Sequence, residues 1–149
     1  MSKIRITKEF KFESAHALLG YDGPCKNIHG HSYKMAVTLI GEPIHDATSP
    51  KNGMVMDFGE LKQIVNESIV KPFDHALILN ANTKEVQSTE VKSLSGKLIL
   101  ADYQPSCENL LIDFAEKIKN KLPDNVSLFS IRLDETSNSY AEWYAEDNK

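Results

Sequence analysis

The chain has 149 residues, of which 41% are hydrophobic and 26% are charged, which predicts a single domain over residues 1–149 with a modest core. Its formal charge is −4, and no segment concentrates positive charge as a nucleic-acid groove requires, so we expect no nucleic-acid partner. No apolar run approaches the roughly 20 residues that cross a bilayer, and the N-terminus has no apolar signal core. We therefore expect a cytoplasmic protein that does not bind membranes.

The two cysteines are Cys25 and Cys107. Two are too few for a disulfide framework in a chain of this size, and the expected compartment is reducing. We expect both to be free thiols.

Alternating side chains near the start of the chain predict two strands. Even-numbered residues over 4–12 are mostly apolar, and the same face reaches His16 if the strand continues that far. In the second strand, the apolar odd-numbered residues over 33–39 share a face that extends back to His31 and His29. Because strand side chains repeat with a period of two, both of these histidines project from one face.

Two helices are predicted next. Asp57 followed by Glu60 has the spacing of a capping box, and the helix that it opens should end before Pro72. Ser106 is the expected N-cap of a second helix, which has lysines near its C-terminal end up to Lys121.

Two further strands are predicted at residues 126–134 and 140–145. The order of two strands, two helices and two strands favours an α+β fold with a four-stranded antiparallel sheet. Residues 80–104 fit neither class well. They form either a surface hairpin, in which residues 86–92 pair with residues 97–100, or a long mobile loop.

The segment from Cys25 to His31 contains the most informative motif. His29 and His31 can bind one ion together, and His16 can supply a third imidazole from the neighbouring strand. Three nitrogen ligands with a fourth position open are typical of a catalytic zinc site. The alternative is that these histidines are ordinary polar residues near a turn.

Cys25 has two interpretations that its spacing does not separate. It is either a fourth zinc ligand, which would close the site, or a base beside the metal. A lone cysteine can also be a small buried apolar residue, but the neighbouring Gly23, Pro24 and Lys26 argue against deep burial.

Asp74 and His75 follow the first predicted helix. Adjacent side chains in an extended segment point apart, so a contact between them requires a turn. Without one, they are a surface polar pair.

Glu135 has the parity of the apolar residues Ile131 and Leu133. A carboxylate on that face needs partners, and it suits a ligand with two adjacent N–H donors, such as a pterin or guanine edge. Alternatively, it is a solvated residue at the end of a strand.

Six motifs, taken together and in order, resemble the family of 6-pyruvoyltetrahydropterin synthases and 6-carboxytetrahydropterin synthases over nearly the whole chain. They are Phe12-x-Ser-Ala-His16, Cys25-x-x-x-His29-Gly-His31, Gly53-Met-Val-Met-Asp57-Phe58, Phe73-Asp74-His75, Pro105-Ser-Cys-Glu-Asn109 and Glu135-Thr136.

The resemblance implies a role for each matched residue. It implies zinc ligands at His16, His29 and His31, a catalytic base at Cys25 that acts with Asp74 and His75, a pterin anchor at Glu135, and further pterin contacts at Ser106 and Cys107. Cys107 stands where the family usually has threonine or serine, and a thiol is a weaker hydrogen-bonding group than a hydroxyl.

The resemblance also implies a tunnelling fold, in which sheets from several subunits close into a barrel, and a homo-oligomer, commonly a hexamer built as a dimer of trimers. The implied function is zinc-dependent conversion of 7,8-dihydroneopterin triphosphate to 6-carboxytetrahydropterin, the queuosine precursor, since the three residues between Cys25 and His29 match the carboxy-forming branch. The alternatives are a 6-pyruvoyltetrahydropterin synthase and a non-catalytic oligomer module stabilised by zinc.

Overall fold

The computed structural model describes residues 1–87, 93 and 95–149. Its strands form one six-stranded sheet in the order β4-β3-β1-β2-β5-β6. The strands are β1 (Ile4–His16), β2 (His29–Gly41), β3 (Ala76–Asn80), β4 (Leu98–Ala101), β5 (Val126–Thr136) and β6 (Ser139–Tyr144). The helical segments are η1 (Pro24–Lys26), α1 (Phe58–Val65), η2 (Asn66–Val70), α2 (Lys71–Phe73), α3 (Cys107–Lys119) and η4 (Ala145–Asn148).

The antiparallel part of the sheet agrees with the prediction from alternation. β1 pairs with β2, β2 with β5, and β5 with β6, all antiparallel. The four-stranded expectation was nevertheless wrong, because β3 pairs parallel with β1 and β4 pairs parallel with β3. The protein therefore has a mixed six-stranded sheet in an α+β fold.

Part of the region over residues 80–104 forms the strand β4, which pairs with β3. Residues 88–92 of the suggested hairpin lie outside the described residues. The other half, at 97–100, contributes to β4, which extends the sheet beside β3. A parallel pair needs a long crossover connection rather than a tight turn, so the segment between β3 and β4 is long for a topological reason.

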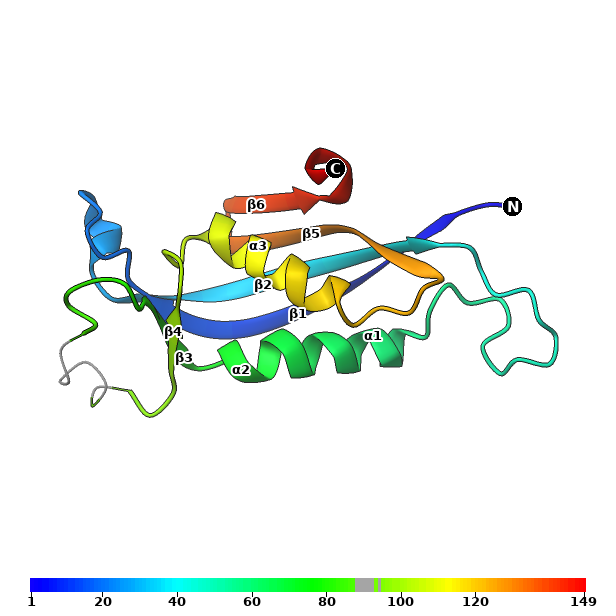
Figure 1. The fold of residues 1–149 in the computed structure, drawn as a ribbon, viewed down its shortest axis with the longest axis horizontal. Coiled ribbons are helices and arrows are strands. Elements are labelled where there is room, and N and C mark those ends of the chain that lie inside the picture. Colours follow the sequence, from blue (N-terminus) through cyan, green and yellow to red (C-terminus); the bar gives the residue numbers. More distant parts are fainter. Residues whose placement is uncertain (88–92, 94) are drawn as a thin grey trace.

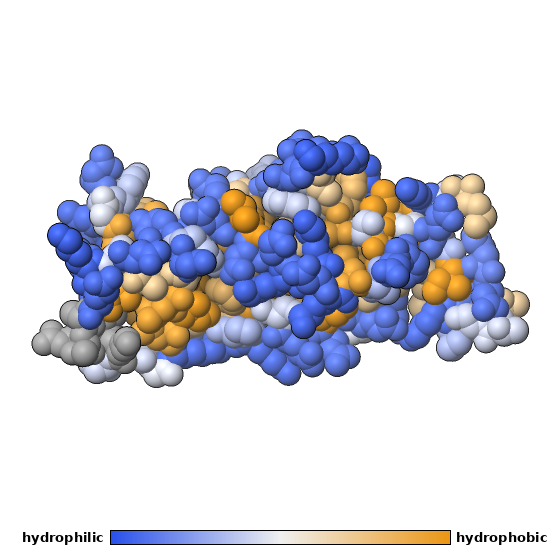
Figure 2. Space-filling model, in the orientation of Figure 1, coloured by the Kyte–Doolittle hydropathy of each residue, from blue (hydrophilic) through white to orange (hydrophobic). Residues whose placement is uncertain are grey.

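The helices cover the apolar face of the sheet (Figure 1). Phe114 of α3 packs edge-on against Phe12 of β1, with ring centroids 6.0 Å apart, and against Phe73 of α2 at 5.0 Å. All three side chains are buried, and burying an aromatic or aliphatic side chain of this size stabilises a fold by about 1.5–3 kcal/mol. In Figure 2, polar residues cover much of the visible surface, while apolar residues gather over β3 and β4.

The first helical segment runs further than predicted. Asp57 is the N-cap of α1, as expected, and its side chain accepts a hydrogen bond from the backbone N–H of Gly59 at 2.7 Å. The helix continues through the π-helical turn η2 into α2, and thus passes Pro72. The N–H of Lys71 donates to Asn66 across this wide turn. Proline has no N–H to donate and normally interrupts a helix. Beside the wider π-helical turn, Pro72 is accommodated and the helix reaches Phe73.

The second predicted helix and its cap are confirmed. Ser106 precedes α3, and its hydroxyl accepts a hydrogen bond from the N–H of Asn109 at 3.2 Å. Both cysteines are free, as expected. Within the described ranges, no helix has the length and apolar character needed to span a membrane.

Segments far apart in the sequence meet at one end of the molecule. Figure 1 shows the end of β1, the start of β2, the end of α2, the start of α3 and the turn between β5 and β6 at this end. Most of the candidate site residues lie on or next to these segments, and Cys25 lies in η1, which joins β1 to β2.

Candidate metal centre

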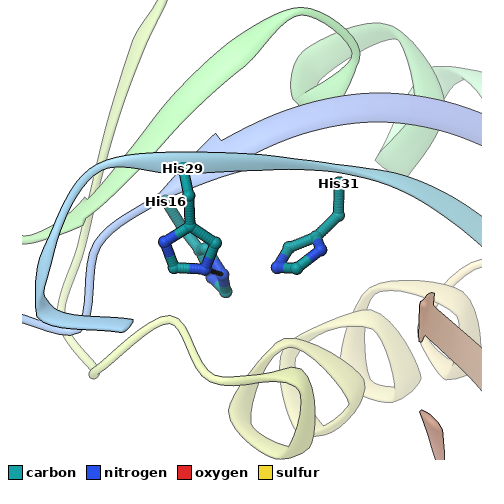
Figure 3. Close-up of side chains that lie close together, drawn as sticks. All are labelled: His16, His29 and His31. Carbon is teal, nitrogen blue, oxygen red and sulfur yellow. Dashed lines mark hydrogen bonds between the residues drawn. The ribbon is translucent and has the colours of Figure 1, made fainter. Parts of the chain in front are cut away.

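Three histidines converge where β1 ends and β2 begins (Figure 3). His16 and His29 are direct partners in the antiparallel register, and His31 lies two residues further along β2. The ring centroids are 4.5 Å apart for His16 and His29, 5.1 Å for His16 and His31, and 4.9 Å for His29 and His31. One ring nitrogen from each histidine lies within 4.8 Å of the other two. The predicted convergence is thus present.

Backbone carbonyls fix the protonation of two of these rings. Nδ1 of His16 lies 2.7 Å from the carbonyl oxygen of Pro105, and Nδ1 of His29 lies 2.7 Å from that of Asn27. A carbonyl only accepts, so each Nδ1 carries the proton and donates it. Both Nε2 atoms then bear lone pairs, and they face each other at 3.0 Å. Two lone pairs at this distance are stabilised by a cation between them.

The third imidazole presents a buried nitrogen. Nε2 of His31 has no hydrogen-bond partner among the described residues. Burial lowers the pKa of His16 and of His31, although the Pro105 carbonyl partly opposes the shift at His16. Neutral imidazole is the form that binds a metal ion, so the donors fit a divalent ion such as zinc.

Glu135 lies beside the histidines, at a local irregularity in the sheet. The register of β5 against β6 shifts between Asp134 and Thr136, and Glu135 falls within this shift. Bulges of this kind redirect a side chain. Its Oε1 lies 3.8 Å from Nε2 of His31, and the side chain is 25% exposed.

Tyr33 also lies next to the histidines, whereas the sequence predicted only that it lies on the apolar face of its strand. It is 1% exposed, it stacks on Phe12, and its ring lies 5.5 Å from that of His31. Burial, with a contribution from Glu135, raises the pKa of Tyr33, so the hydroxyl stays protonated. Tyr33 is odd-numbered like His29 and His31, and this shared parity indicates that the three side chains lie on one face of the strand.

Ser106 and Cys107 lie at the start of α3, next to the carbonyl of Pro105 that bonds His16. Cys107 is 8% exposed, and its thiol donates to the carbonyl of Leu133 at 3.4 Å. Burial and the charge of Glu135 raise the pKa of Cys107 to about 12, so it is a neutral thiol.

Cys25 lies in η1, within the connection between β1 and β2, and is partly exposed. Its carbonyl accepts a hydrogen bond from the N–H of Leu18 at 2.8 Å. Of the side chains that the structure describes, the metal-binding cluster contains the three histidines and does not include this thiol.

Asp74 and His75 form the turn that their contact required. Asp74 ends α2 in an extended conformation, and His75 follows with φ 59°. Nδ1 of His75 lies 3.1 Å from Oδ2 of Asp74. The N–H of Glu13 donates to Oδ1 of Asp74 at 2.9 Å, and this bond, with the contact to His75, lowers the pKa of Asp74.

A groove of about 420 Å³ connects this turn with the histidine strands. Its lining includes His75, His31, Glu13, Ser32 and Ser95. The groove lies on the polar face of the sheet, where Glu13 and Ser32 are exposed, and the Asp74–His75 pair lies outside the cluster of three histidine nitrogens.

The fold and the donor set define an α+β protein with a cluster of three histidines that could hold one metal ion. The chain belongs to the 6-pyruvoyl tetrahydropterin synthase family, whose model matches residues 5–146. The resemblance drawn from the motifs is thereby confirmed.

Among curated relatives, the chain is similar to the 6-carboxy-5,6,7,8-tetrahydropterin synthase of Haemophilus influenzae, with 37% identity over 141 residues that cover 93% of this chain and 97% of that protein. It is also similar to the enzyme of the same name from Rickettsia typhi, at 31% identity over 93% of this chain and 99% of that one.

Solved structures share the fold. The 6-pyruvoyl tetrahydropterin synthase of Plasmodium vivax superposes with a TM-score of 0.74 at 19% identity, over 96% of this chain and 98% of that one. The Caenorhabditis elegans 6-pyruvoyl tetrahydropterin synthase gives 0.66 at 24% identity, over 97% of each chain.

Proposed function

We propose that this chain is a zinc-dependent synthase that converts 7,8-dihydroneopterin triphosphate and water to 6-carboxy-5,6,7,8-tetrahydropterin, triphosphate and acetaldehyde, a step of queuosine biosynthesis. The observation that carries the proposal is the cluster of three imidazole nitrogens beside the carboxylate of Glu135. The names of the Haemophilus and Rickettsia relatives support the carboxy product.

In this proposal, His16, His29 and His31 hold the zinc ion. Bound zinc supplies Lewis-acid polarisation of substrate side-chain oxygens, which makes neighbouring C–H and O–H bonds more acidic. The carbonyls of Pro105 and Asn27 keep two of the rings in the tautomer that presents Nε2. Such outer contacts orient the ligands of a metal site.

Proton movement falls to Cys25 and to the Asp74–His75 pair. The thiolate of Cys25 would take a proton from the substrate side chain and return it to the pterin ring. Asp74 accepts hydrogen bonds from the Glu13 N–H and from His75, so it holds the imidazole for transfer at a substrate hydroxyl. This division of roles follows the family resemblance and the contact of His75 with Asp74.

We further propose that Glu135 anchors the pterin by accepting two N–H bonds from the ring edge, with Ser106 and Cys107 lining the same site. The carboxylate is partly exposed and therefore accessible, and its charge acts on Cys107 at the start of α3. Because the thiol of Cys107 already donates to Leu133, we assign it packing against the ring.

Glu135→Gln tests this anchor. The amide presents one acceptor and one donor, so one donor of the ring edge would face another donor. We expect a loss of about 2–4 kcal/mol, or roughly 30- to 800-fold in affinity for the pterin. Calorimetry with the non-reactive pterins sepiapterin or biopterin measures the change.

Glu116→Gln is the matched control, because that exposed carboxylate on α3 pairs only with Lys119 among the described side chains. Zinc content should be unchanged in both variants. Equal pterin affinity in Glu135→Gln and the unmodified protein would place the ring edge elsewhere.

We propose a homo-oligomer, a hexamer built as a dimer of trimers. One face of the sheet is not covered by helices (Figure 1). Polar and charged residues of β1 and β2, such as Glu9, Lys11 and Lys34, are exposed on it. β4 and β6 are the edge strands. Barrel closure between subunits would pair such edges. Analytical ultracentrifugation tests this state, and a monomer at micromolar concentration would contradict it.

The function itself is tested by incubating the zinc-loaded protein with 7,8-dihydroneopterin triphosphate and measuring released triphosphate. Release should require zinc and should be lost in His31→Ala. A protein that binds zinc but releases no triphosphate would support the non-catalytic module instead.

A further inference from the structure

Among the described residues, His75 is the one non-glycine residue with a positive φ, at 59°. L-residues with a side chain enter this left-handed region only when the surroundings hold them there. The orientation of the imidazole relative to Asp74 thus depends on what fixes this turn.

Part of the constraint comes from β1. The N–H of His75 donates to the carbonyl of Glu13 at 2.5 Å, and the hydroxyl of Ser14 donates to the carbonyl of Phe73. The last helical bond of α2 runs from the N–H of Asp74 to Val70 at 2.8 Å. Because the His75 N–H is used by Glu13, the carbonyl of Lys71 loses the partner that one more helical residue would supply.

Lys97 satisfies that carbonyl from another segment. Its Nζ lies 2.5 Å from the carbonyl oxygen of Lys71 and 2.6 Å from that of Asp74. An ammonium group at the C-terminal end of a helix also faces the negative end of the helix dipole. The second bond is made directly to the peptide between Asp74 and His75, so Lys97 contacts the turn itself.

Lys97 is itself held in place. Its carbonyl accepts a hydrogen bond from the N–H of Leu77 in β3 at 3.0 Å, and its N–H donates to the hydroxyl of Ser95 at 3.2 Å. Ser95 lines the same groove as His75. The end of the connection between β3 and β4 is thereby joined to the groove wall.

We propose that Lys97 is a positioning residue that fixes the Asp74–His75 pair for proton transfer. The connection between β3 and β4 then does more than join two parallel strands, because its last residue donates to the carbonyl of Lys71 at the end of the helix and to that of Asp74 within the pair. This inference rests on the proposed function, in which the pair handles a substrate proton.

Lys97→Met removes the ammonium while keeping a long apolar stem. We expect kcat to fall by about 10- to 100-fold, as for a small misplacement of a catalytic group, with KM and zinc content unchanged. Lys97→Arg should restore at least half of the activity, because a guanidinium can also donate to two carbonyls. Lys84→Met is the matched control, since Lys84 is an exposed lysine of the same connection, and it should keep the original rate.

A double-mutant cycle separates positioning from general destabilisation. If Lys97 acts through the pair, Lys97→Met should cost little further activity in a His75→Ala background. Additive losses in the two variants, or an unchanged kcat in Lys97→Met, would overturn the proposal.

A readout independent of turnover keeps this inference separate from the proposed function. In protein labelled with ¹³C at histidine Cε1, Lys97→Met should shift the His75 resonance and leave that of the exposed His45 in place. A protein without synthase activity that still shows this shift would refute the function but not the contact. An unmoved His75 resonance would refute the positioning role even in an active enzyme.

Discussion

Replacement of Cys25 by alanine should lower kcat by about 10²- to 10⁴-fold, the typical contribution of a general base, while the zinc content stays at that of the unmodified protein. The thiol lies in η1, outside the cluster of three histidine nitrogens. Removing it therefore takes away a proton acceptor without removing a ligand. Steady-state kinetics, with elemental analysis of the same samples, measure both quantities.

Cys25→Ser is the informative companion variant. A hydroxyl has nearly the size of a thiol but is a far weaker acid, so activity should remain low although the shape is kept. If zinc disappears together with activity in Cys25→Ala, the cysteine is a fourth ligand. The interpretation of a closed structural zinc site, in which Cys25 is the fourth ligand, would then be correct.

Replacing one of the three clustered histidines should strongly lower the zinc content of the protein. The unmodified protein should hold about one zinc per chain, and His29→Ala or His31→Ala should lose it on dialysis, because two protein ligands remain where three are needed. Elemental analysis after dialysis measures the content. Zinc retained in full by both variants would refute the ligand assignment.

His45→Ala serves as the control, since His45 is exposed and lies outside the cluster. Thermal unfolding adds an independent readout. A bound ion stabilises the folded state by mass action, so a chelator should lower the Tm of the unmodified protein and of His45→Ala. It should leave the Tm of His29→Ala unchanged.

The part of the site that the sequence predicted follows from strand periodicity. Alternation placed His29 and His31 on the apolar face of one strand and His16 on that of the other, and the antiparallel register then brought His16 opposite His29. Two rules, a period of two and pairing of consecutive strands, were sufficient. The cap at Ser106 was predicted for a similar local reason.

The strand β3 was not predicted, and the β4 segment was considered only as one half of a surface hairpin, because neither strand carries a clear alternation. The first four residues of β3 are all buried, and a short, continuously apolar run is consistent with a strand or with part of a helix. β4 has only four residues and follows a long connection. Its pairing with β3 is a tertiary contact that local pattern does not encode.

The local sequence pattern also did not predict the contacts that orient the candidate catalytic residues. Glu135 lies at a register shift beside the histidines, and Lys97 reaches the Asp74 turn from 23 residues further along the chain. Parity placed Glu135 on the correct face, but its 3.8 Å approach to His31 is a contact between β5 and β2, which are far apart in the sequence. The carbonyls that fix His16 and His29 likewise come from loops.

The most direct test of the central claim is the identity of the product. Zinc-loaded protein is incubated with 7,8-dihydroneopterin triphosphate under anaerobic conditions, and the pterins and small aldehydes are separated and identified by mass. We predict 6-carboxy-5,6,7,8-tetrahydropterin with acetaldehyde and triphosphate in equal amounts. Recovery of the unchanged substrate, or of 6-pyruvoyltetrahydropterin without acetaldehyde, would contradict the account.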